Sequence, residues 1–429
     1  MRVHLDYVGC RLNQAEIERM ARQFAARGDT LAADASGANL VVINTCAVTT
    51  DAARKSRQMV LQAGRANPDA RIVATGCAAE FDPASLRAMP GVERVISNAD
   101  KDHLVEQVAP ADMPLYDREP IARDPLPPGT LGRTRAFVKV QDGCDNRCTF
   151  CLTTLLRGEG RSRPSAEVVG EIEALVAAGY REVVLTGVHL GSYGHDLGDP
   201  RGLSHLVETI LAGTSVPRLR LSSLEPWDLD ADFFALWSDP RLCPHLHLPL
   251  QSGSDAVLRR MARRTSRQGF AGLVESARAR IPGLAITSDV IVGFPAETGA
   301  EFAETLAFVQ EIGFARLHVF GYSRRPGTPA ARMSGHLPQS LIDERRAALT
   351  ALSGRLWRDY QTAHLGRRVE VLWESAHGAT PEGFVWSGHT GSDLRVFTTS
   401  PLLLHNTVTT VRLSALTPRG LEAVSDPVP

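Results

Sequence analysis

A recurring alternation of short apolar runs and helical segments between residues 134 and 322 constrains the fold of this chain most. Six of these runs have the length and the branched, apolar side chains of buried strands. They are 137–140, 182–185, 219–222, 245–248, 285–292 and 315–320. Strands that are separated by helices build a parallel sheet, so the alternation predicts an α/β protein with a partial (β/α)6 barrel.

The segments on either side predict two further domains and a connector. Residues 1–108 alternate strand-like and helical patterns at shorter length, which indicates a small parallel α/β domain. Residues 109–133 are rich in Pro and aperiodic, as in an extended linker. The barrel and the helix after it take up 134–365, and 366–429 has only short β-like pieces, which favours a small all-β barrel.

Three cysteines, Cys144, Cys148 and Cys151, follow the first predicted barrel strand and the turn residue Gly143. The carboxyl ends of barrel strands form the active-site face, so we expect the thiolates there. Three thiolates hold three irons of a 4Fe-4S cluster and leave the fourth iron open to a substrate. Zinc, the alternative, needs a fourth ligand, and no further His or Cys lies within about 30 residues of the triplet. The spacing therefore favours an iron–sulfur cluster.

A second group of cysteines, Cys10, Cys46 and Cys77, is scattered along the N-terminal domain, each at the end of a predicted strand. The carboxyl ends of parallel strands lie side by side, so these thiolates are predicted to meet and to hold a second cluster. The alternative, that they are small buried residues at strand ends, stays open on these residues alone. Cys243 has no such companions and is interpreted as a structural core residue.

The motif Cys144-Asp-Asn-Arg-Cys148-Thr-Phe-Cys151 resembles the cluster motif of the radical S-adenosylmethionine (SAM) enzymes. The N-terminal cysteines resemble those of the methylthiotransferases within that group. Further segments are similar to the methylthiotransferase branch that acts on threonylcarbamoyladenosine in tRNA. They are 185–194, 222–226, 247–254, 287–298 and 317–332. The resemblance implies a methylthiotransferase N-terminal domain, a radical SAM barrel and a C-terminal TRAM domain.

Three residues depart from what is usual in that family, namely Thr154, Glu80 and Gly321. None of them is a cluster ligand. The C-terminal domain departs more, because after Gly366 the chain has five Arg, no Lys and six acidic residues. A strongly basic RNA-binding surface is therefore not evident in that domain.

The resemblance also implies a reaction and its cofactors. The substrate is expected to be N6-threonylcarbamoyladenosine beside the tRNA anticodon, and the product its 2-methylthio derivative. Two 4Fe-4S clusters and SAM are the expected cofactors, with one SAM as methyl source and another as radical source. The expected SAM contacts follow the second and fourth barrel strands and the cluster loop. They are Thr186, Gly187, Gln251, Ser252 and Arg157. Gly187 alone is also compatible with a tight turn.

Arginines gather at two places where they are predicted to contact tRNA phosphates. They are Arg157, Arg161 and Arg163 beside the cluster loop, and Arg259 and Arg263 in the acid-free run 259–267. A solvated helix face is the alternative for the second group. The charge of the whole chain gives no indication of RNA binding, since 47 basic and 48 acidic side chains give a net charge of -1.

Two other functions remain open at this stage. The same chemistry serves isopentenyladenosine in tRNA or a ribosomal-protein aspartate, and a non-catalytic iron–sulfur RNA-binding protein is a third reading. A binding module needs neither two open three-Cys sites nor a complete barrel, which disfavours the third. The family chemistry implies an electron donor protein and a sulfur source as partners. The charged N-terminus and the absence of 18 consecutive apolar residues predict a cytoplasmic protein with no membrane partner.

Overall fold

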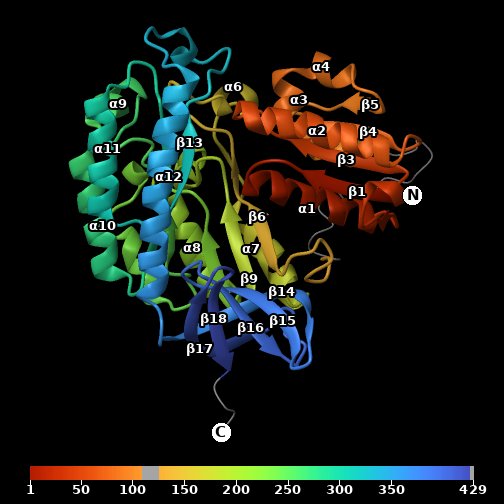
Figure 1. Cartoon of the computed structure of the whole chain (residues 1–429). Helices are drawn as coiled ribbons and strands as arrows, with labels where there is room; N and C mark the ends of the chain where they lie inside the picture. Colours follow the sequence, from red (N-terminus) through yellow and green to blue (C-terminus); the bar gives the residue numbers. More distant parts are fainter. Residues whose placement is uncertain (109–124, 426–429) are drawn as a thin grey trace.

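The computed structural model of the chain describes residues 1–108 and 125–425 (Figure 1). Most of the predicted linker, 109–124, lies outside the described residues. A five-stranded sheet, a row of β/α units and a closed β-barrel follow one another along the described chain. The mixed α/β fold expected from the sequence, with a parallel N-terminal sheet and a strand-rich C-terminal unit, is confirmed.

The N-terminal sheet has the strand order β2-β1-β3-β4-β5. Its strands are β1 (Arg2–Tyr7), β2 (Thr30–Leu31), β3 (Leu40–Thr45), β4 (Arg71–Gly76) and β5 (Val92–Val95). Its helices are α1 (Arg11–Ala26), α2 (Thr50–Ala66), α3 (Cys77–Phe81), α4 (Pro83–Arg87) and α5 (Leu104–Val108). Every residue of β3 is buried, and β3 pairs in parallel with β1 and β4. The carboxyl ends of these three strands therefore lie side by side.

The central unit has six parallel strands in two triplets, β10-β9-β6 and β11-β12-β13. They are β6 (Arg135–Lys139), β9 (Glu182–Thr186), β10 (Arg218–Leu221), β11 (His245–His247), β12 (Ala285–Val292) and β13 (Arg316–Gly321). The main helices are α7 (Ser165–Ala177), α8 (Gly202–Gly213), α10 (Arg267–Arg280), α11 (Gly299–Ile312) and α12 (Gln339–Thr362). Isolated bridges between Leu219 and Leu242 and between Ser223 and His247 join the triplets into one curved wall.

The wall is open between β6 and β13, and the N-terminal unit packs at the β6 edge through α1 (Figure 1). Ala15 of α1 packs on Phe137 and Val184, and the Phe137 amide donates to the Glu18 carboxylate at 3.1 Å. Two short helices, α6 (Thr153–Arg157) and α9 (Asp255–Arg260), lie in loops after barrel strands. The α1 contact brings the cysteine edge of the N-terminal sheet to the barrel.

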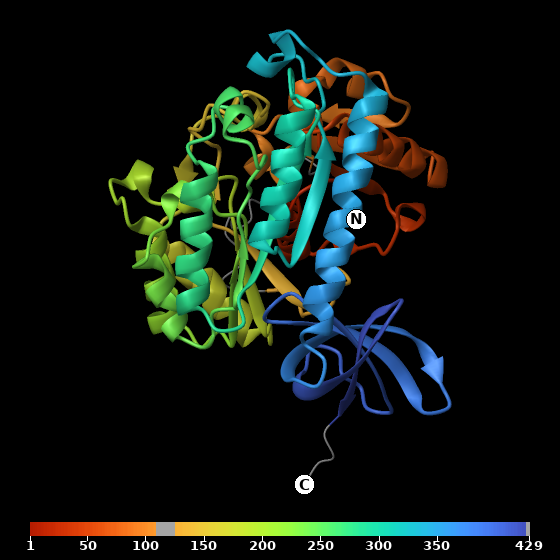
Figure 2. The ribbon, with the colours of Figure 1, turned by 60° about the vertical axis from the view of Figure 1, so that its left-hand side comes forward.

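The C-terminal unit is a closed barrel with the order β14-β15-β16-β18-β17. Its strands are β14 (Arg368–Thr380), β15 (Gly383–Thr390), β16 (Arg395–Ser400), β17 (Val408–Thr417) and β18 (Gly420–Ser425). The single helix α12 runs along the central unit and leads into it (Figure 2). Arg220 of β10 donates to the carbonyls of Thr390 and Gly391, so the loop after β15 sits against the amino end of the barrel. None of the described helices has the length and apolar character needed to cross a membrane.

Candidate active site

The first cysteine triplet lies on a tight loop after β6. Gly143 has φ +72°, and a Cβ there would collide with the Glu159 carbonyl, so the turn requires glycine. The Cys144 amide donates to the Gly158 carbonyl at 3.0 Å, and the Cys151 amide to the Cys148 carbonyl at 3.1 Å. These bonds curl the loop so that the three thiols face one small region.

Thr154, which stands where the family usually has Pro, takes part in holding this loop. Its hydroxyl lies 3.0 Å from the Cys144 carbonyl and 3.1 Å from the Asn146 carbonyl. A hydroxyl can donate to either carbonyl, whereas Pro supplies no side-chain donor. The departure from the family pattern therefore adds a local support for the cluster loop.

A guanidinium is positioned against the same triplet. Arg263 Nη1 lies 3.8 Å from Cys148 Sγ, and Arg263 is held by Glu225 at 2.5 and 3.1 Å and by the Trp227 ring at 4.4 Å. Burial raises the pKa of the Cys148 thiol to about 11, and Arg263 opposes that rise. A cation held in this position favours the thiolate form that an iron ligand requires.

A histidine that is distant in the sequence lies beside the loop. His189 contacts Asp228 through Nε2 at 2.5 Å and Asn146 through Nδ1 at 3.2 Å. Burial lowers the pKa of His189, but Asp228 and Cys144 outweigh it and raise that pKa to about 10. The sequence argument against zinc overlooked this residue. Its two ring nitrogens are already engaged by Asp228 and Asn146.

The second triplet forms a pocket at the carboxyl edge of the N-terminal sheet. Cys46 directly follows β3, Cys77 is the first residue of α3, and Cys10 precedes α1. A Cβ on Gly9, which has φ +112°, would come within 2.9 Å of the Cys46 side chain, so the Cys10 loop closely approaches Cys46. Burial raises the pKa of Cys46 to about 12, and the neighbouring Cys77 and Cys10 thiolates add to the rise. The three sulfurs are therefore mutual neighbours.

The two cysteine pockets share an apolar wall. Ala47 and Cys77 pack in one cluster with Leu152 and Leu156 of the cluster loop and α6. Leu152 directly follows Cys151 and Ala47 directly follows Cys46. Figure 1 shows α6 next to α3 at this junction. The fold thus brings two three-thiol sites from separate sheets to one place.

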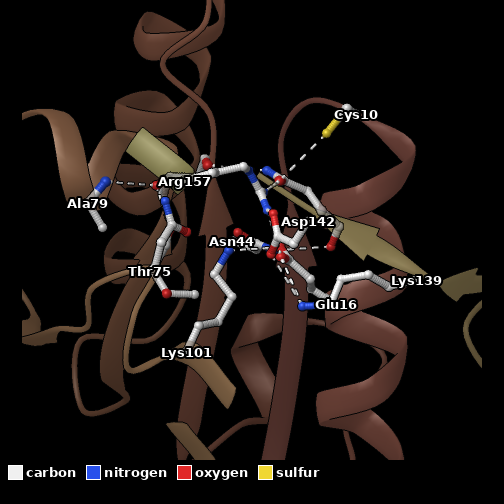
Figure 3. Close-up of polar contacts among 12 residues, drawn as sticks. Cys10, Glu16, Asn44, Thr75, Ala79, Lys101, Lys139, Asp142 and Arg157 are labelled. Carbon is white, nitrogen blue, oxygen red and sulfur yellow. Dashed lines mark hydrogen bonds and ion pairs between the residues drawn. The ribbon is translucent and has the colours of Figure 1, made fainter. Parts of the chain in front are cut away.

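A buried ion network also links the two pockets (Figure 3). Arg157, the last residue of α6, contacts Glu16 and Asp142 at 2.9 Å each and Asn13 at 2.8 Å. Asn13 in turn accepts a hydrogen bond from Cys10 Sγ at 3.7 Å. Lys101 Nζ completes the network at 2.8 Å from Glu16. Arg157 therefore ties the segment after Cys151 to the helix after Cys10.

The two cysteine triplets fit iron–sulfur clusters better than they fit single metal ions. Among the described residues, one group of His, Cys, Asp and Glu has its ligand atoms within 4.8 Å of one another, namely His247, Asp289 and His318. The cysteine triplets are more widely spaced, as is required of thiolates that each bind a different iron. Three thiols without a converging fourth ligand are the donor set of an open cluster.

The residues expected to contact SAM divide into two groups. Thr186 ends β9 at the cluster edge, and a Cβ on Gly187 would come within 2.9 Å of the Gln141 side chain. Gln251 has φ +70° and pairs its backbone with β12 on both sides, a strained position typical of a functional site. Ser252 is fully buried with its hydroxyl 3.3 Å from Thr305, and its expected contact with the cofactor stays a prediction.

The arginines expected to bind RNA also fall into two groups, those that pair with carboxylates and those that are exposed. The guanidinium of Arg157 is buried among carboxylates, which leaves it neither a phosphate nor a SAM contact. Arg263 is buried between Glu225 and Trp227, and Arg163 contacts Glu171 at 2.7 Å. Arg161 and Arg259 are exposed. The carboxylate partners Glu16 of Arg157 and Glu225 of Arg263 lie far away along the chain, whereas Glu171, the partner of Arg163, lies eight residues after it.

Several site residues were missed from the sequence. His189 with Asp228 was not singled out, and Arg263, which was expected to contact RNA, instead pairs with Glu225 beside the cluster loop. Both pairs lie in segments between the barrel strands. His247 and Asp289 lie 3.3 Å apart on adjacent strands, with His318 on the next. His247, Asp289 and His318 fall within segments that carried the family resemblance. That resemblance was the one feature of the sequence that could have pointed to them.

Comparisons with known proteins agree with this geometry. The model described as "Uncharacterized protein family UPF0004" matches residues 2–97, and the Radical SAM superfamily model matches 138–309. The threonylcarbamoyladenosine tRNA methylthiotransferase MtaB of Bacillus subtilis is 39% identical over 401 residues, which cover 91% of this chain and 88% of that protein. The chain belongs to the radical SAM methylthiotransferase family. A 4Fe-4S cluster and SAM accompany this family, and the methylthiotransferase is an enzyme.

Other relatives of this methylthiotransferase carry different names. The tRNA-2-methylthio-N(6)-dimethylallyladenosine synthase of Parafrankia is 38% identical, with coverage of 86% of this chain and 77% of that protein. Among solved structures, the radical SAM methyltransferase TsrM of Kitasatospora setae has a TM-score of 0.56 at 17% identity. The match covers 77% of this chain and 74% of TsrM. That likeness concerns the fold alone.

Proposed function

We propose that this methylthiotransferase converts N6-threonylcarbamoyladenosine beside the anticodon of tRNA to its 2-methylthio derivative, using two 4Fe-4S clusters and SAM. The observation that carries the proposal is the shared wall between the two cysteine pockets, where Leu152, which follows Cys151, belongs to the same apolar cluster as Cys77. A reaction that joins a sulfur to a carbon needs the sulfur site and the radical site within reach of one substrate atom.

In this proposal the chain's own residues divide the work. Cys144, Cys148 and Cys151 hold the barrel cluster, which when bound supplies the electron for reductive cleavage of SAM. Cys10, Cys46 and Cys77 hold the second cluster. Arg157 positions the two cysteine loops relative to each other, and Arg263 favours the thiolate form of Cys148 against the effect of burial. Thr186, Gly187 and Gln251 contact SAM at the strand ends.

The partners follow from the same chemistry. Exposed Arg161 and Arg259 contact tRNA phosphates, while an electron donor protein and a sulfur source complete the turnover. The residue ranges of the three domains and the linker, 1–108, 134–365, 366–429 and 109–133, are part of the proposal, with the last domain of TRAM type. The reaction takes place in the cytoplasm, where tRNA is available.

Dimethylallyladenosine in tRNA is the second candidate substrate, because synthases of that product are nearly as similar in sequence. Coverage favours the first candidate, since the match takes in 88% of the Bacillus protein and 77% of the Parafrankia protein. The chain thus spans more of a threonylcarbamoyladenosine enzyme than of a dimethylallyladenosine enzyme.

Mass spectrometry of tRNA nucleosides tests the substrate. We expect a strain that lacks this chain to lose the methylthio group from threonylcarbamoyladenosine while methylthiolated dimethylallyladenosine, if the strain makes it, is unchanged. Complementation with the wild-type chain should restore the product, and the Cys144→Ala variant should not. Loss confined to the dimethylallyl nucleoside would replace the proposed substrate with the second candidate.

A further inference from the structure

Arg325 is a buried cation that has no carboxylate partner among the described residues. Only 6% of the residue is exposed, and its Nε and Nη2 atoms have no hydrogen-bond partner among the described residues. Its Nη1 has one long contact, 3.5 Å to the Thr50 hydroxyl. Other buried arginines each pair with a carboxylate. They are Arg22 with Glu171, Arg157 with Glu16, Arg218 and Arg220 with Glu182, Arg263 with Glu225 and Arg345 with Glu297. An unpaired buried guanidinium is expensive, which indicates that an anion occupies this place in the working enzyme.

The neighbours of Arg325 show where that anion lies. Its guanidinium stacks 4.6 Å over the ring of Phe81, the last residue of the helix that begins with Cys77. Thr50 begins the helix that follows Cys46. Cys46 is also close enough for its thiolate to act electrostatically on Arg325. Two of the three N-terminal cysteine segments therefore contact this one side chain.

The barrel loop that carries Arg325 is anchored to the N-terminal unit. The Ser323 hydroxyl lies 2.6 Å from the Thr50 hydroxyl and accepts from the Thr50 amide at 3.2 Å. Thr328 bonds back to the Arg325 carbonyl at 2.8 Å, which rigidifies the turn. The barrel thus presents a preorganised pair of N–H donors to the N-terminal pocket.

We propose that Arg325 is a positioning residue for the N-terminal cluster, with Nε and Nη2 donating to the anionic cluster and to a sulfide bound at its open iron. The inference rests on the proposed function, since it requires the second cluster. A phosphodiester of RNA is the other anion that a guanidinium takes. The burial of both free donors under Phe81 favours a small anion inside the pocket over a backbone phosphate outside it.

The experiment uses the full chain with Cys144, Cys148 and Cys151 replaced by Ala, so that any cluster resides in the N-terminal pocket. After anaerobic reconstitution, iron content, the midpoint potential from EPR-monitored titration, and the EPR response to added sodium sulfide are measured. Arg325→Met is compared with Arg324→Met, whose exposed arginine bonds through Nε to the Ala331 carbonyl at 2.9 Å. Arg325→Lys, which keeps the charge, is the conservative variant, and Arg325→Gln replaces Met if that variant does not fold.

We expect Arg325→Met to lower the midpoint potential, because the removed cation stabilises the more negative reduced cluster. Sulfide should bind at least about tenfold more weakly, since two charge-assisted hydrogen bonds are lost. Arg324→Met should behave as the parent, and Arg325→Lys should recover most of the potential. A potential and sulfide affinity equal to those of Arg324→Met would overturn the inference, as would an effect confined to tRNA affinity. A parent variant that binds no iron would instead reject the second cluster and, with it, the proposed function.

Discussion

Arg157 is a buried structural cation, and its replacement should affect stability and not RNA affinity. Arg157 lies 2.9 Å from both Glu16 and Asp142, and Arg157→Met removes this shared cation from the two carboxylates. Breaking one side of a buried ion pair costs about 3–5 kcal/mol, so we expect the free energy of unfolding to fall by that amount. Urea denaturation followed by circular dichroism measures it.

Arg161→Met is the matched control in the same segment, because Arg161 is exposed. We expect it to leave the unfolding free energy unchanged and to reduce the salt dependence of tRNA binding by about one counterion. The salt dependence of Arg157→Met should equal that of the wild type. An Arg157 variant of normal stability with a flatter salt dependence would show that the arginine contacts RNA after all.

Gly187 supports the cluster loop through Gln141. The Gln141 amide nitrogen donates to the Gly143 carbonyl at 2.9 Å, and its oxygen accepts from the His189 amide at 2.9 Å. A Cβ on residue 187 would displace that side chain, so we expect Gly187→Ala to lower barrel iron and reductive SAM cleavage several-fold. In Gly354→Ala, whose new Cβ meets nothing, both quantities should equal those of the wild type. Iron analysis and 5′-deoxyadenosine assays distinguish the two variants.

At the scale of elements, the base of the barrel is an ionic junction with the C-terminal unit. Glu182 of β9 contacts Arg220 at 2.7 Å and Arg218 at 2.8 Å, and both arginines donate to carbonyls at the end of β15. Burial works to raise the pKa of Glu182, but Arg220, Arg218 and Arg135 lower it to about 2. The carboxylate therefore bonds the two arginines that hold the C-terminal unit.

This junction makes stability depend on pH in a defined direction. Because the folded pKa of Glu182 lies below its unfolded value, the carboxylate stabilises the fold above about pH 4.5, and that stability is lost as pH falls toward 2. The shift corresponds to about 3 kcal/mol. We expect the difference in unfolding free energy between wild type and Glu182→Gln to shrink across this range in denaturant titrations of the cluster-free chain. A constant difference from pH 6 to pH 2.5 would contradict the assignment.

Elements were predictable where burial is local to a run of residues. The strand β12 lies at 285–292 as expected, because Ile286, Val290 and Val292 are branched apolar residues that pack in the barrel core. The partners of Arg157 and Arg263 were not predictable, because Glu16 and Glu225 lie far away along the chain and only tertiary packing brings them close. For the same reason, the positions of His189 and of the unpaired Arg325 in the site were not predictable from sequence. The cysteines were accessible from sequence because they follow the carboxyl ends of strands, and the fold class determines the direction of those strands.

At the scale of the whole molecule, the two clusters should have separable duties. With Cys10, Cys46 and Cys77 all replaced by Ala, we expect iron to fall from about eight to about four atoms per chain. The variant should still form 5′-deoxyadenosine from SAM but yield no methylthio nucleoside, because radical generation uses the barrel triplet alone. Iron analysis and product assays check both halves. A folded variant that no longer cleaves SAM would refute the division.

The helix α12 sets a length that an RNA partner has to match. It has 24 residues, which at 1.5 Å each span about 36 Å, and it begins after the loop that touches the N-terminal pocket and ends at the C-terminal barrel. The helix therefore sets a fixed distance between the cysteine sites at one end and the C-terminal barrel at the other. If the proposed substrate is right, we expect a short anticodon hairpin to reach the cysteine sites without reaching the C-terminal barrel, whereas a whole tRNA is long enough to touch both.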